Sequence, residues 1–353
     1  MNAVIRGFYL LWSVALETES MMSHKGITFF MPVIDSVAIM ADYTIASYAK
    51  LRDSHIPFTL LVYPNFLSPR IKEKHIPKWK RYEYVEIADT AEQEATTRPS
   101  PWKEEDDHIV AEYHVGALQS GSRVYKWLGP WERHDVILDT ELHKIDSEYV
   151  ATVDADFEIL NGDFIGYIIE RMEQNPNLKV VSSDYSPTSR YNSSIFRTGY
   201  CYLHERYSAW FCVYKREALL FPESHRYRDK FDPASGEFYA WDTSAYLQQR
   251  LREERGYEME AIAGFDRSFI HYGAFAKNRS ITSRNVSIYR ALKLAAKMPL
   301  GAQVLPYDPA RHRFASKIDR RITWIMVELL FRRLFDESER HRPIYADARG
   351  AQR

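Results

Sequence analysis

The chain has 353 residues, 45% of them hydrophobic and 14% aromatic, so it can bury one large core or two modest ones. Its 47 lysines and arginines are balanced by 48 aspartates and glutamates, which excludes the overall basic charge of a nucleic-acid binder or a polybasic membrane protein. Two cysteines, Cys201 and Cys212, are too few for a disulfide framework or a four-cysteine zinc site. Their scarcity indicates a reducing compartment and predicts a cytoplasmic protein.

The N-terminal residues 1–25 include a short apolar run, from Gly7 to Leu16. The run resembles the centre of a signal peptide, but no small-residue cleavage site follows it, and Glu17 and Glu19 come immediately after. About ten apolar residues are also too few to cross a bilayer as a helix. We therefore interpret residues 1–25 as an N-terminal extension that precedes the folded domain.

From about residue 27 to residue 184, short β-rich runs alternate with helical stretches, a pattern typical of an α/β protein with a parallel sheet. Asp35 is the expected N-cap of the first helix. Residues 90–108 are polar, include two prolines and indicate a loop. The expected strands are residues 27–33, 57–65, 82–89 and 148–153, and the expected helices are residues 35–54 and 134–145.

Two aspartates follow the strand expected at residues 148–153, in the sequence VATVDAD. An unpaired carboxylate is costly to bury, so Asp154 and Asp156 must face a crevice that holds water, a cation or hydrogen-bond donors. Open α/β sheets bind ligands at the carboxyl ends of their strands. Residues i and i+2 of an extended chain point the same way, and two carboxylates in one crevice suit Mn²⁺ or Mg²⁺, which in turn bind phosphate. In the alternative interpretation, Asp154 caps a loop and Asp156 is solvated.

This segment and its surroundings resemble the nucleotide-sugar glycosyltransferases of the GT-A fold, and are most similar to their large family-2-like group. The resemblance rests on TFFMPVID, FTLLVYPN and HDVILDTELHKIDSEYVATVDAD, and on FYAWDTSAYLQQRL and FIHYGAFAKN further along the chain. It implies a Rossmann-like, mixed and mostly parallel sheet flanked by helices. It also implies that the D-x-D carboxylates hold Mn²⁺ or Mg²⁺ on the donor diphosphate, with Ala155 between them at the nucleotide-sugar site.

The chain departs from the family pattern in one place. Many family members carry an Arg-Asn pair in the helix before the metal strand, and this chain has Leu138 and Asp139 there instead.

The resemblance also implies a division of the chain. The expected parts are a catalytic domain over residues 26–280, with a nucleotide-sugar-binding half (26–160) and an acceptor-binding half (161–280), and a helical C-terminal extension over residues 281–353.

A histidine and a lysine lie close together in RSFIHYGAFAKN, residues 267–278. His271 ends an apolar segment expected to be a strand, and a neutral imidazole is a good third ligand for Mn²⁺. The resemblance implies the same role, since many GT-A enzymes complete the metal site with a late histidine. Lys277 could neutralise a leaving diphosphate. In the alternative interpretation, His271 is hydrogen-bonded at a strand end.

An acidic residue that could activate the acceptor lies in EFYAWDTSAYLQQRLRE, residues 237–253. Transfer with inversion needs a carboxylate that removes the proton from the acceptor hydroxyl. The resemblance gives this role to an acidic residue opening a helix here, which nominates Asp242, with Glu237 in reserve. Asp242 followed by Thr243 and Ser244 is also what a helix N-cap looks like.

Aromatic residues near Asp242 are candidates for acceptor contacts. Their rings would raise the pKa of that carboxyl and offer faces to a sugar. We nominate Tyr239 and Trp241 and, from the polar and aromatic stretch 185–220, Trp210. Ordinary core packing is the alternative explanation.

The donor nucleotide is expected to contact the loops that follow the first three strands and the helix before the metal strand. Neither G-x-G-x-x-G nor G-x-x-x-x-G-K-[ST] occurs, so dinucleotide and P-loop binding lose their main support, and a metal must hold the phosphates. The candidate nucleotide contacts are Pro32, Asp35, Asn65, Asp89, His134, Asp135 and Asp139.

Two helices are expected in the C-terminal extension, at VSIYRALKLAAK and at IDRRITWIMVELLFRRLFDESERHR. The second has a broad apolar stripe beside Arg320 and Arg321. We expect the stripe to pack on its own domain, with homodimerisation or peripheral membrane contact as alternatives.

The sequence thus predicts a metal-dependent glycosyltransferase that transfers a sugar from a nucleotide-diphosphate donor to a hydroxyl of a glycan, a lipid-linked sugar or a metabolite, with inversion. Two alternatives stay open. One is a non-catalytic sugar- or nucleotide-binding protein with the same fold, and the other is a sugar nucleotidyltransferase.

Overall fold

The computed structural model describes residues 24–91, 134–192, 200–223, 225, 228–232, 234, 237–262, 264–272, 282–297 and 307–323. The expected N-terminal extension, most of the loop expected at residues 90–108, Lys277 and most of the apolar stripe of the last helix lie outside these residues.

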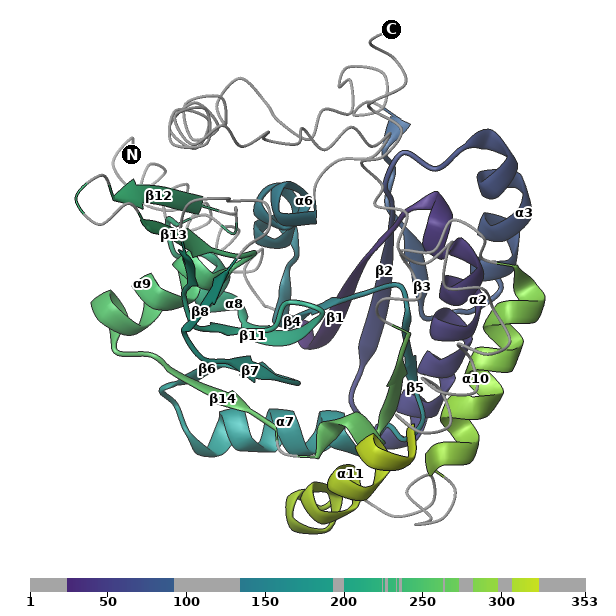
Figure 1. The fold of residues 1–353 in the computed structure, drawn as a ribbon. Coiled ribbons are helices and arrows are strands. Elements are labelled where there is room, and N and C mark those ends of the chain that lie inside the picture. Colours follow the sequence, from purple (N-terminus) through teal and green to yellow (C-terminus); the bar gives the residue numbers. More distant parts are fainter. Residues whose placement is uncertain are drawn as a thin grey trace, which may run out of the picture.

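The centre of the fold is a seven-stranded sheet (Figure 1). Its strands are, in spatial order, β14 (Glu258–Ala261), β6 (Leu178–Ser182), β11 (Phe211–Lys215), β4 (Ser147–Val153), β1 (His24–Val33), β2 (Phe58–Pro64) and β3 (Val85–Ile87). Neighbours run parallel except at β11, which is antiparallel to both β4 and β6. The sheet is therefore mixed and mostly parallel, which confirms the expected fold class.

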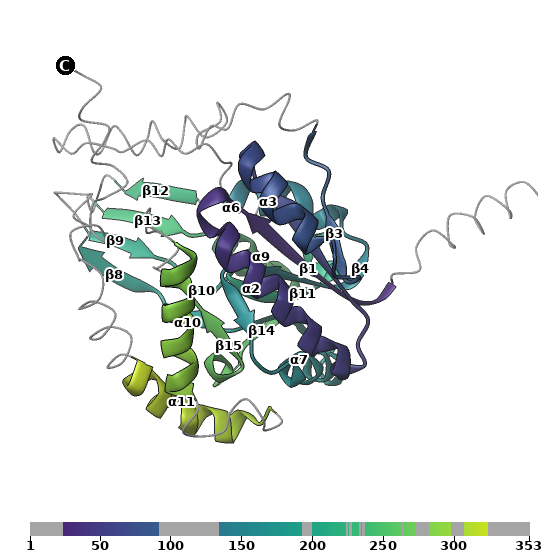
Figure 2. The same cartoon turned by 90° about the vertical axis from the view of Figure 1, so that its right-hand side faces the viewer.

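Helices cover both faces of the sheet because successive strand residues point to opposite sides. Phe29 of β1 enters an apolar layer with one set of helices, and its neighbour Phe30 enters a second layer with another set. Figure 2 shows two helices of the first set, α2 and α3, side by side. The first set is α2 (Ala38–Ser47), α3 (Pro69–Trp79) and α7 (Asp163–Gln174), and the second is α6 (His134–Glu141), α8 (Arg216–Leu219) and α9 (Ala245–Arg255).

The helix expected at residues 35–54 is helical throughout but in three pieces, with 3-10 turns η1 (Asp35–Val37) and η2 (Tyr48–Ser54) on either side of α2. Its expected N-cap is wrong. Asp35 lies inside the first turn, where its carboxylate accepts a hydrogen bond from the backbone N–H of Ser68 at 2.9 Å. The aspartate joins two loops instead of capping its own helix.

Three other expected elements differ in their bounds or are divided. The strand expected at residues 82–89 contains only the three residues of β3, because this edge strand pairs with a short part of β2. The helix expected to open at Asp242 begins at Ala245, and the residues before it form a strand, β13 (Glu237–Trp241). The expected helix at residues 134–145 is α6 followed by the 3-10 turn η4 (Leu142–Lys144).

In the described part of the chain, three smaller sheets lie around the central one. The first pairs β5 (Phe157–Ile159) with β15 (Phe269–His271), the second pairs β7 (Tyr185–Ser186) with β10 (Arg206–Tyr207), and the third contains β12 (Arg228–Asp232), β13, β9 (Tyr200–Leu203) and β8 (Ser189–Asn192) in that order. A further 3-10 turn is η5 (Phe265–Arg267).

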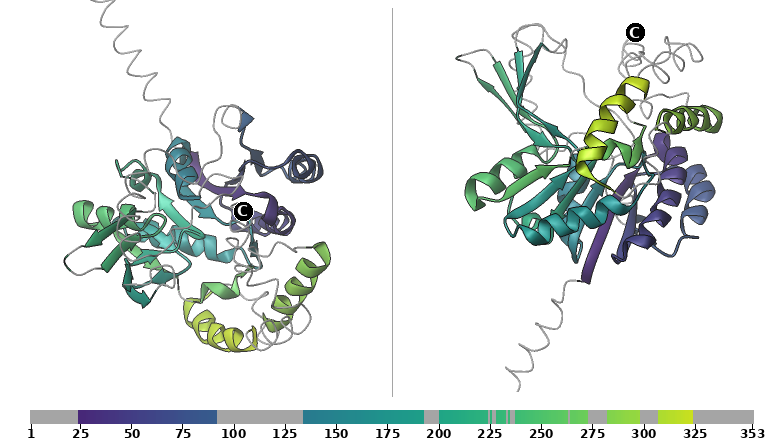
Figure 3. Two further views of the ribbon diagram at one scale, coloured as in Figure 1. Left: turned by 45° about the horizontal axis from the view of Figure 1, so that its top comes forward. Right: turned by 90° about the horizontal axis from the view of Figure 1, so that it is seen from below.

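The first C-terminal helix, α10 (Ser283–Lys297), contains the helix expected at VSIYRALKLAAK. The second, α11 (Pro309–Thr323), begins before the other expected helix, which starts at Ile318 and lies mostly outside the described residues. Figure 3 shows α10 beside α2, where Val286 and Tyr289 join an apolar cluster with Met40 and Ile270. Among the described residues, no helix combines the length and apolar character needed to span a membrane.

Candidate active site

Three side chains with metal-binding chemistry converge at the carboxyl end of β4. Asp154 follows the last residue of that strand, Asp156 comes two residues later, and His271 ends β15 opposite Phe157 of β5. The imidazole Nε2 lies 3.7 Å from a carboxylate oxygen of Asp154 and 3.4 Å from one of Asp156. One ligand atom from each residue lies within 4.8 Å of the other two. The antiparallel pairing of β5 and β15 is what brings the histidine to the aspartates.

The backbone of the D-x-D segment is held by three other parts of the chain. The N–H of Asp154 donates to the carbonyl of Trp210 at 2.9 Å. The hydroxyl of Thr44, on α2, donates to the carbonyl of Ala155 at 2.9 Å. The N–H of Tyr272 donates to the carbonyl of Asp156 at 3.0 Å. These bonds fix the direction of both carboxylates.

The three side chains differ in exposure and influence one another's charge. The Asp156 side chain is 6% exposed, whereas those of Asp154 and His271 are 35% and 27% exposed. Burial favours the neutral imidazole of His271, but the hydrogen bonds and charges of the two carboxylates raise its pKa to about 10. Burial opposes ionisation of Asp154, yet the hydrogen bond to His271, assisted by His134 and Arg206, lowers its pKa. The positive charge of the protonated imidazole thus offsets part of the negative charge of Asp154 and Asp156.

This donor set fits a divalent cation. Two carboxylates and one imidazole are ligands that Mn²⁺ accepts, and Mg²⁺ accepts the carboxylates. A cation held by Asp154, Asp156 and His271 would replace the proton on the imidazole and supply positive charge for phosphate oxygens.

Trp210 belongs to this cluster. Its ring stacks on the imidazole of His271, with centroids 4.4 Å apart and an interplanar angle of 9°. It also packs on Phe157 and Phe269. The sequence nominated Trp210 as an acceptor contact, and within the described residues its ring lies on the proposed metal ligand His271.

Behind the cluster lies a buried ion pair that the sequence analysis missed. Glu158, only 2% exposed, accepts hydrogen bonds from the guanidinium of Arg290 at 2.7 to 3.0 Å and from the hydroxyl of Tyr272 at 2.9 Å. Arg290 lies on α10, and Tyr272 follows His271 directly. A glutamate inside an apolar strand is the one local signal that could have suggested a buried partner.

Asp242 lies in the turn between β13 and α9 and is 35% exposed. One carboxylate oxygen lies 2.6 Å from the guanidinium of Arg206, and the other accepts the backbone N–H of Thr243 at 2.7 Å. The residue at the N-cap position of α9 is Ser244, in a left-handed conformation with φ of 65°, so the expected cap role of Asp242 is wrong. The sequence also missed Arg206, which belongs to the two-residue strand β10.

The aromatic candidates near Asp242 stack on their neighbours. Tyr239 lies parallel to Tyr202 with ring centroids 5.3 Å apart. Trp241 stacks on His204 at 4.1 Å and donates its indole N–H to Gln249 at 2.6 Å. Glu237, the reserve base, lies on β13 opposite Asp232, and its side chain is outside the described part of the structure.

The nucleotide candidates fall into two groups. Those after β1, β2 and β3 lie at one edge of the sheet: Pro32 near the end of β1, Asp35 in η1, the buried Asn65 after β2, and the exposed Asp89, which accepts the N–H of Ala91.

The second group lies on α6. His134 is close enough to Asp154 for its charge to lower the pKa of that carboxyl. Asp135 is buried, whereas Asp139 accepts the backbone N–H of His225 at 3.0 Å. Asp139 therefore has a structural contact with the segment that precedes β12.

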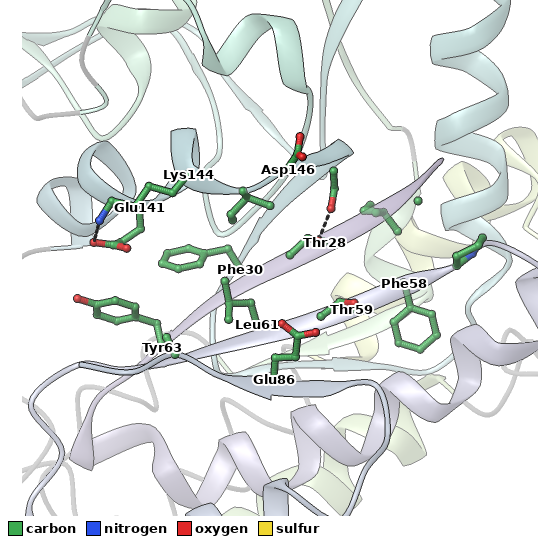
Figure 4. Close-up of a pocket in the computed structure, with 16 residues that line it drawn as sticks. Thr28, Phe30, Phe58, Thr59, Leu61, Tyr63, Glu86, Glu141, Lys144 and Asp146 are labelled. Atoms are coloured by element: carbon green, nitrogen blue, oxygen red, sulfur yellow. Dashed lines mark hydrogen bonds and ion pairs between the residues drawn. The ribbon is translucent and has the colours of Figure 1, made fainter. Parts of the chain in front are cut away.

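A pocket of about 580 Å³ lies elsewhere, on the β1, β2 and β3 face that carries Phe30, Leu61 and Tyr63 (Figure 4). Lys144, paired with Glu141, lines one side of it. None of the site residues nominated from the sequence lines this pocket.

No family model matches the chain, and no curated protein does. Among solved structures, it is similar to the mannosyltransferase PcManGT from Pyrobaculum calidifontis in complex with GDP-Man and Mn²⁺, with 10% identity over 92% of this chain and 79% of that one and a TM-score of 0.37. It is also similar to S. aureus TarS 1-349, with 13% identity over 88% and 92% of the two chains and a TM-score of 0.31.

A third similar structure is CMP:2-keto-3-deoxy-manno-octonic acid synthetase complexed with CTP, with 10% identity over 67% of this chain and 90% of that one and a TM-score of 0.30. Glycosyltransferases and a synthetase that binds CTP are thus among the structures that the chain is similar to. Likeness at this level carries no argument about the activity of this chain, which has to come from its own residues.

Proposed function

We propose that the chain is a metal-dependent glycosyltransferase that moves a sugar from a nucleotide-diphosphate donor to a hydroxyl acceptor. The observation that supports this best is the convergence of Asp154, Asp156 and His271 at the carboxyl end of β4. Two hard oxygen donors and one imidazole at the ligand-binding edge of a mostly parallel sheet suit a cation that binds a diphosphate.

In this proposal Mn²⁺ or Mg²⁺ is bound by the three residues and supplies charge for the donor diphosphate. Asp242 removes the proton from the acceptor hydroxyl, with Glu237 in reserve, and the reaction inverts the anomeric configuration. The half-exposed position of Asp242 at the end of β13 is accessible to an acceptor.

The remaining nominations are proposals of the same kind. The donor contacts residues after β1 to β3, Ala155 and α6, and the acceptor is a glycan, a lipid-linked sugar or a small molecule. Residues 26–160 form the nucleotide-sugar-binding half, residues 161–280 the acceptor-binding half, and residues 281–353 the helical C-terminal extension. The low cysteine content supports a cytoplasmic protein, with peripheral membrane contact or homodimerisation through the C-terminal helices.

The test is calorimetric titration of UDP and of GDP into the purified protein, with and without Mn²⁺. We expect metal-dependent binding of one nucleotide that Asp156→Ala abolishes. Asp163→Ala removes an exposed carboxylate at the start of α7 and should bind like the wild type.

Nucleotide binding that is equally tight with and without Mn²⁺, or that is unchanged in Asp156→Ala, would contradict the proposed role of Asp154, Asp156 and His271. If no nucleoside diphosphate bound under any metal condition, the proposed glycosyltransferase activity would be abandoned in favour of a non-catalytic protein with this fold. Release of pyrophosphate from a nucleoside triphosphate and a free sugar would point to a nucleotidyltransferase.

A further inference from the structure

The proposed base is held in an ion pair that conflicts with its role. Arg206 Nη1 lies 2.6 Å from a carboxylate oxygen of Asp242. The other oxygen accepts the backbone N–H of Thr243 at 2.7 Å, so both oxygens of the carboxylate already have a donor. A carboxylate that must accept the acceptor proton should lose Arg206 before the transfer.

Arg206 is joined to the metal cluster through the chain. The chain from Arg206 runs directly to Trp210, whose carbonyl binds the N–H of Asp154 and whose ring stacks on His271. The guanidinium that holds the proposed base is thus carried by the segment that leads into the proposed metal site.

The Arg206–Asp242 ion pair can separate at a low cost in free energy. The two side chains are 25% and 35% exposed, so separating them leaves no buried charge without a partner. Arg206 Nε is a buried donor without a hydrogen-bond acceptor among the described residues. The other nearby ion pair, Glu158 with Arg290, has a carboxylate that is 2% exposed, which makes exchange there costly.

We propose that Arg206 binds the donor diphosphate and that this exchange releases Asp242 to act as the base. The inference rests on the proposed function. A guanidinium matches the paired oxygens of a diphosphate, which carries more charge than one carboxylate. Donor binding and activation of the base are therefore linked through one side chain.

The release places the charges where the transfer needs them. The acceptor oxygen forms a bond to the anomeric carbon, and the bond between that carbon and the diphosphate oxygen breaks with its electron pair left on the diphosphate. The acceptor proton passes to the Asp242 carboxylate. Arg206 then faces the negative charge that develops on the leaving diphosphate.

The test needs neither an acceptor nor turnover. In calorimetric titrations with Mn²⁺ and whichever of UDP or GDP the wild type binds, Asp242→Asn should bind the nucleotide about threefold to tenfold more tightly, because Arg206 no longer has to leave a charged partner. Arg206→Met should bind about tenfold or more weakly. In the double variant Arg206→Met with Asp242→Asn, the tightening should disappear.

Glu205→Gln is the matched control. It removes one negative charge from the residue next to Arg206, and that carboxylate is paired with Arg252 instead. It should change nucleotide affinity by less than about twofold, because this carboxylate is engaged by Arg252 and by the hydroxyl of Tyr185. Thermal unfolding of each variant checks that the fold is retained.

Unchanged or weaker binding by Asp242→Asn, or the same tightening without Arg206, would overturn the exchange while leaving the proposed function in place. Loss of all nucleotide binding by the wild type would overturn both. The two failures are therefore distinguishable in one set of titrations.

Discussion

The metal side and the base side of the candidate site are built in different ways. Asp154 and Asp156 continue directly from β4 in the central sheet, and His271 is fixed to them through the pairing of β5 with β15. Asp242 lies at the end of β13, in a separate four-stranded sheet. On the metal side, the imidazole of His271 lies 3.7 Å from Asp154 and 3.4 Å from Asp156, whereas Asp242 is paired with Arg206 from another strand.

The supports behind the two sides differ as well. The metal side is backed by the buried Glu158 and its partner Arg290. The base side is backed by neutral hydrogen bonds, between the Gln248 amide of α9 and the backbone of Tyr207 and between the side chains of His225 and Ser244. The buried ion pair behind the metal side suits a cation site that must keep one geometry. The neutral hydrogen bonds behind the base side suit a site whose Arg206–Asp242 ion pair has to separate.

The largest effect is expected from Arg290→Met. The substitution leaves Glu158 buried without its main partner and should lower the free energy of unfolding by about 3 kcal/mol, the lower end for a broken buried pair because Lys50 lies near the same carboxylate. Urea denaturation followed by tryptophan fluorescence measures it. Arg284→Met, an exposed position on the same helix, should change stability by less than about 0.5 kcal/mol.

If Arg290 supports the metal side specifically, Arg290→Met should also weaken Mn²⁺ binding, measured by electron paramagnetic resonance of free Mn²⁺, and Arg290→Lys should recover part of it. Equal Mn²⁺ affinity in Arg290→Met and the wild type would limit the ion pair to a structural role.

The next effect is a pH dependence that belongs to the base side. Burial lowers the pKa of His225 to about 4, partly opposed by Asp139, and its ring lies 2.8 Å from Ser244 Oγ. Between pH 6.5 and 4 the unfolded chain binds a proton that the folded chain does not. This histidine should therefore contribute stability above pH 6.5 that is lost as the pH falls towards 4, on the order of 3 kcal/mol in all.

Urea denaturation at pH 7, 5.5 and 4.5 measures this loss. The variant His225→Gln should fall less steeply than the wild type over that range, since both proteins share the remaining histidines. Parallel curves would show that His225 titrates in the folded protein as it does in the unfolded chain.

A smaller effect is expected from Gln248→Leu. The Gln248 amide donates to the carbonyl of Tyr207 at 2.9 Å and accepts its N–H at 2.8 Å, so it fixes the backbone next to Arg206. Its loss leaves two backbone groups without partners and should cost about 2 kcal/mol. Gln174→Leu, at an exposed position on α7, is the control. A loss of nucleotide affinity without a loss of stability would instead assign Gln248 to the binding site.

The smallest effect is expected from Thr44→Val. This buried hydroxyl donates to the carbonyl of Ala155, and its removal should cost about 1 kcal/mol in denaturant unfolding. Thr140→Val removes a hydroxyl that, among the described residues, donates to carbonyls of its own helix, and it should cost less than about 0.5 kcal/mol. If both substitutions had the same cost, the link from α2 to the D-x-D segment would contribute nothing particular.

Local patterns in the sequence predicted much of this protein. Apolar runs located β1, β2 and β4, the 3.6-residue period located α2, α6 and α10, and the D-x-D segment was expected at a strand end. These predictions hold because each depends on neighbours a few residues apart. The boundary at Asp242 was wrong because an aspartate followed by threonine and serine fits a cap and a strand-to-helix turn equally well.

By itself, the sequence determined the class of fold and the chemistry available at the end of β4, because strand periodicity and the positions of Asp154 and Asp156 are local properties. Only the tertiary structure decided which distant groups join them. It brings His271 to the aspartates through β15, Arg290 to a glutamate 132 residues away, and Arg206 to Asp242. Such pairs follow from packing and charge compensation in three dimensions. These two effects produce no periodic pattern in the sequence from which the pairs could be predicted.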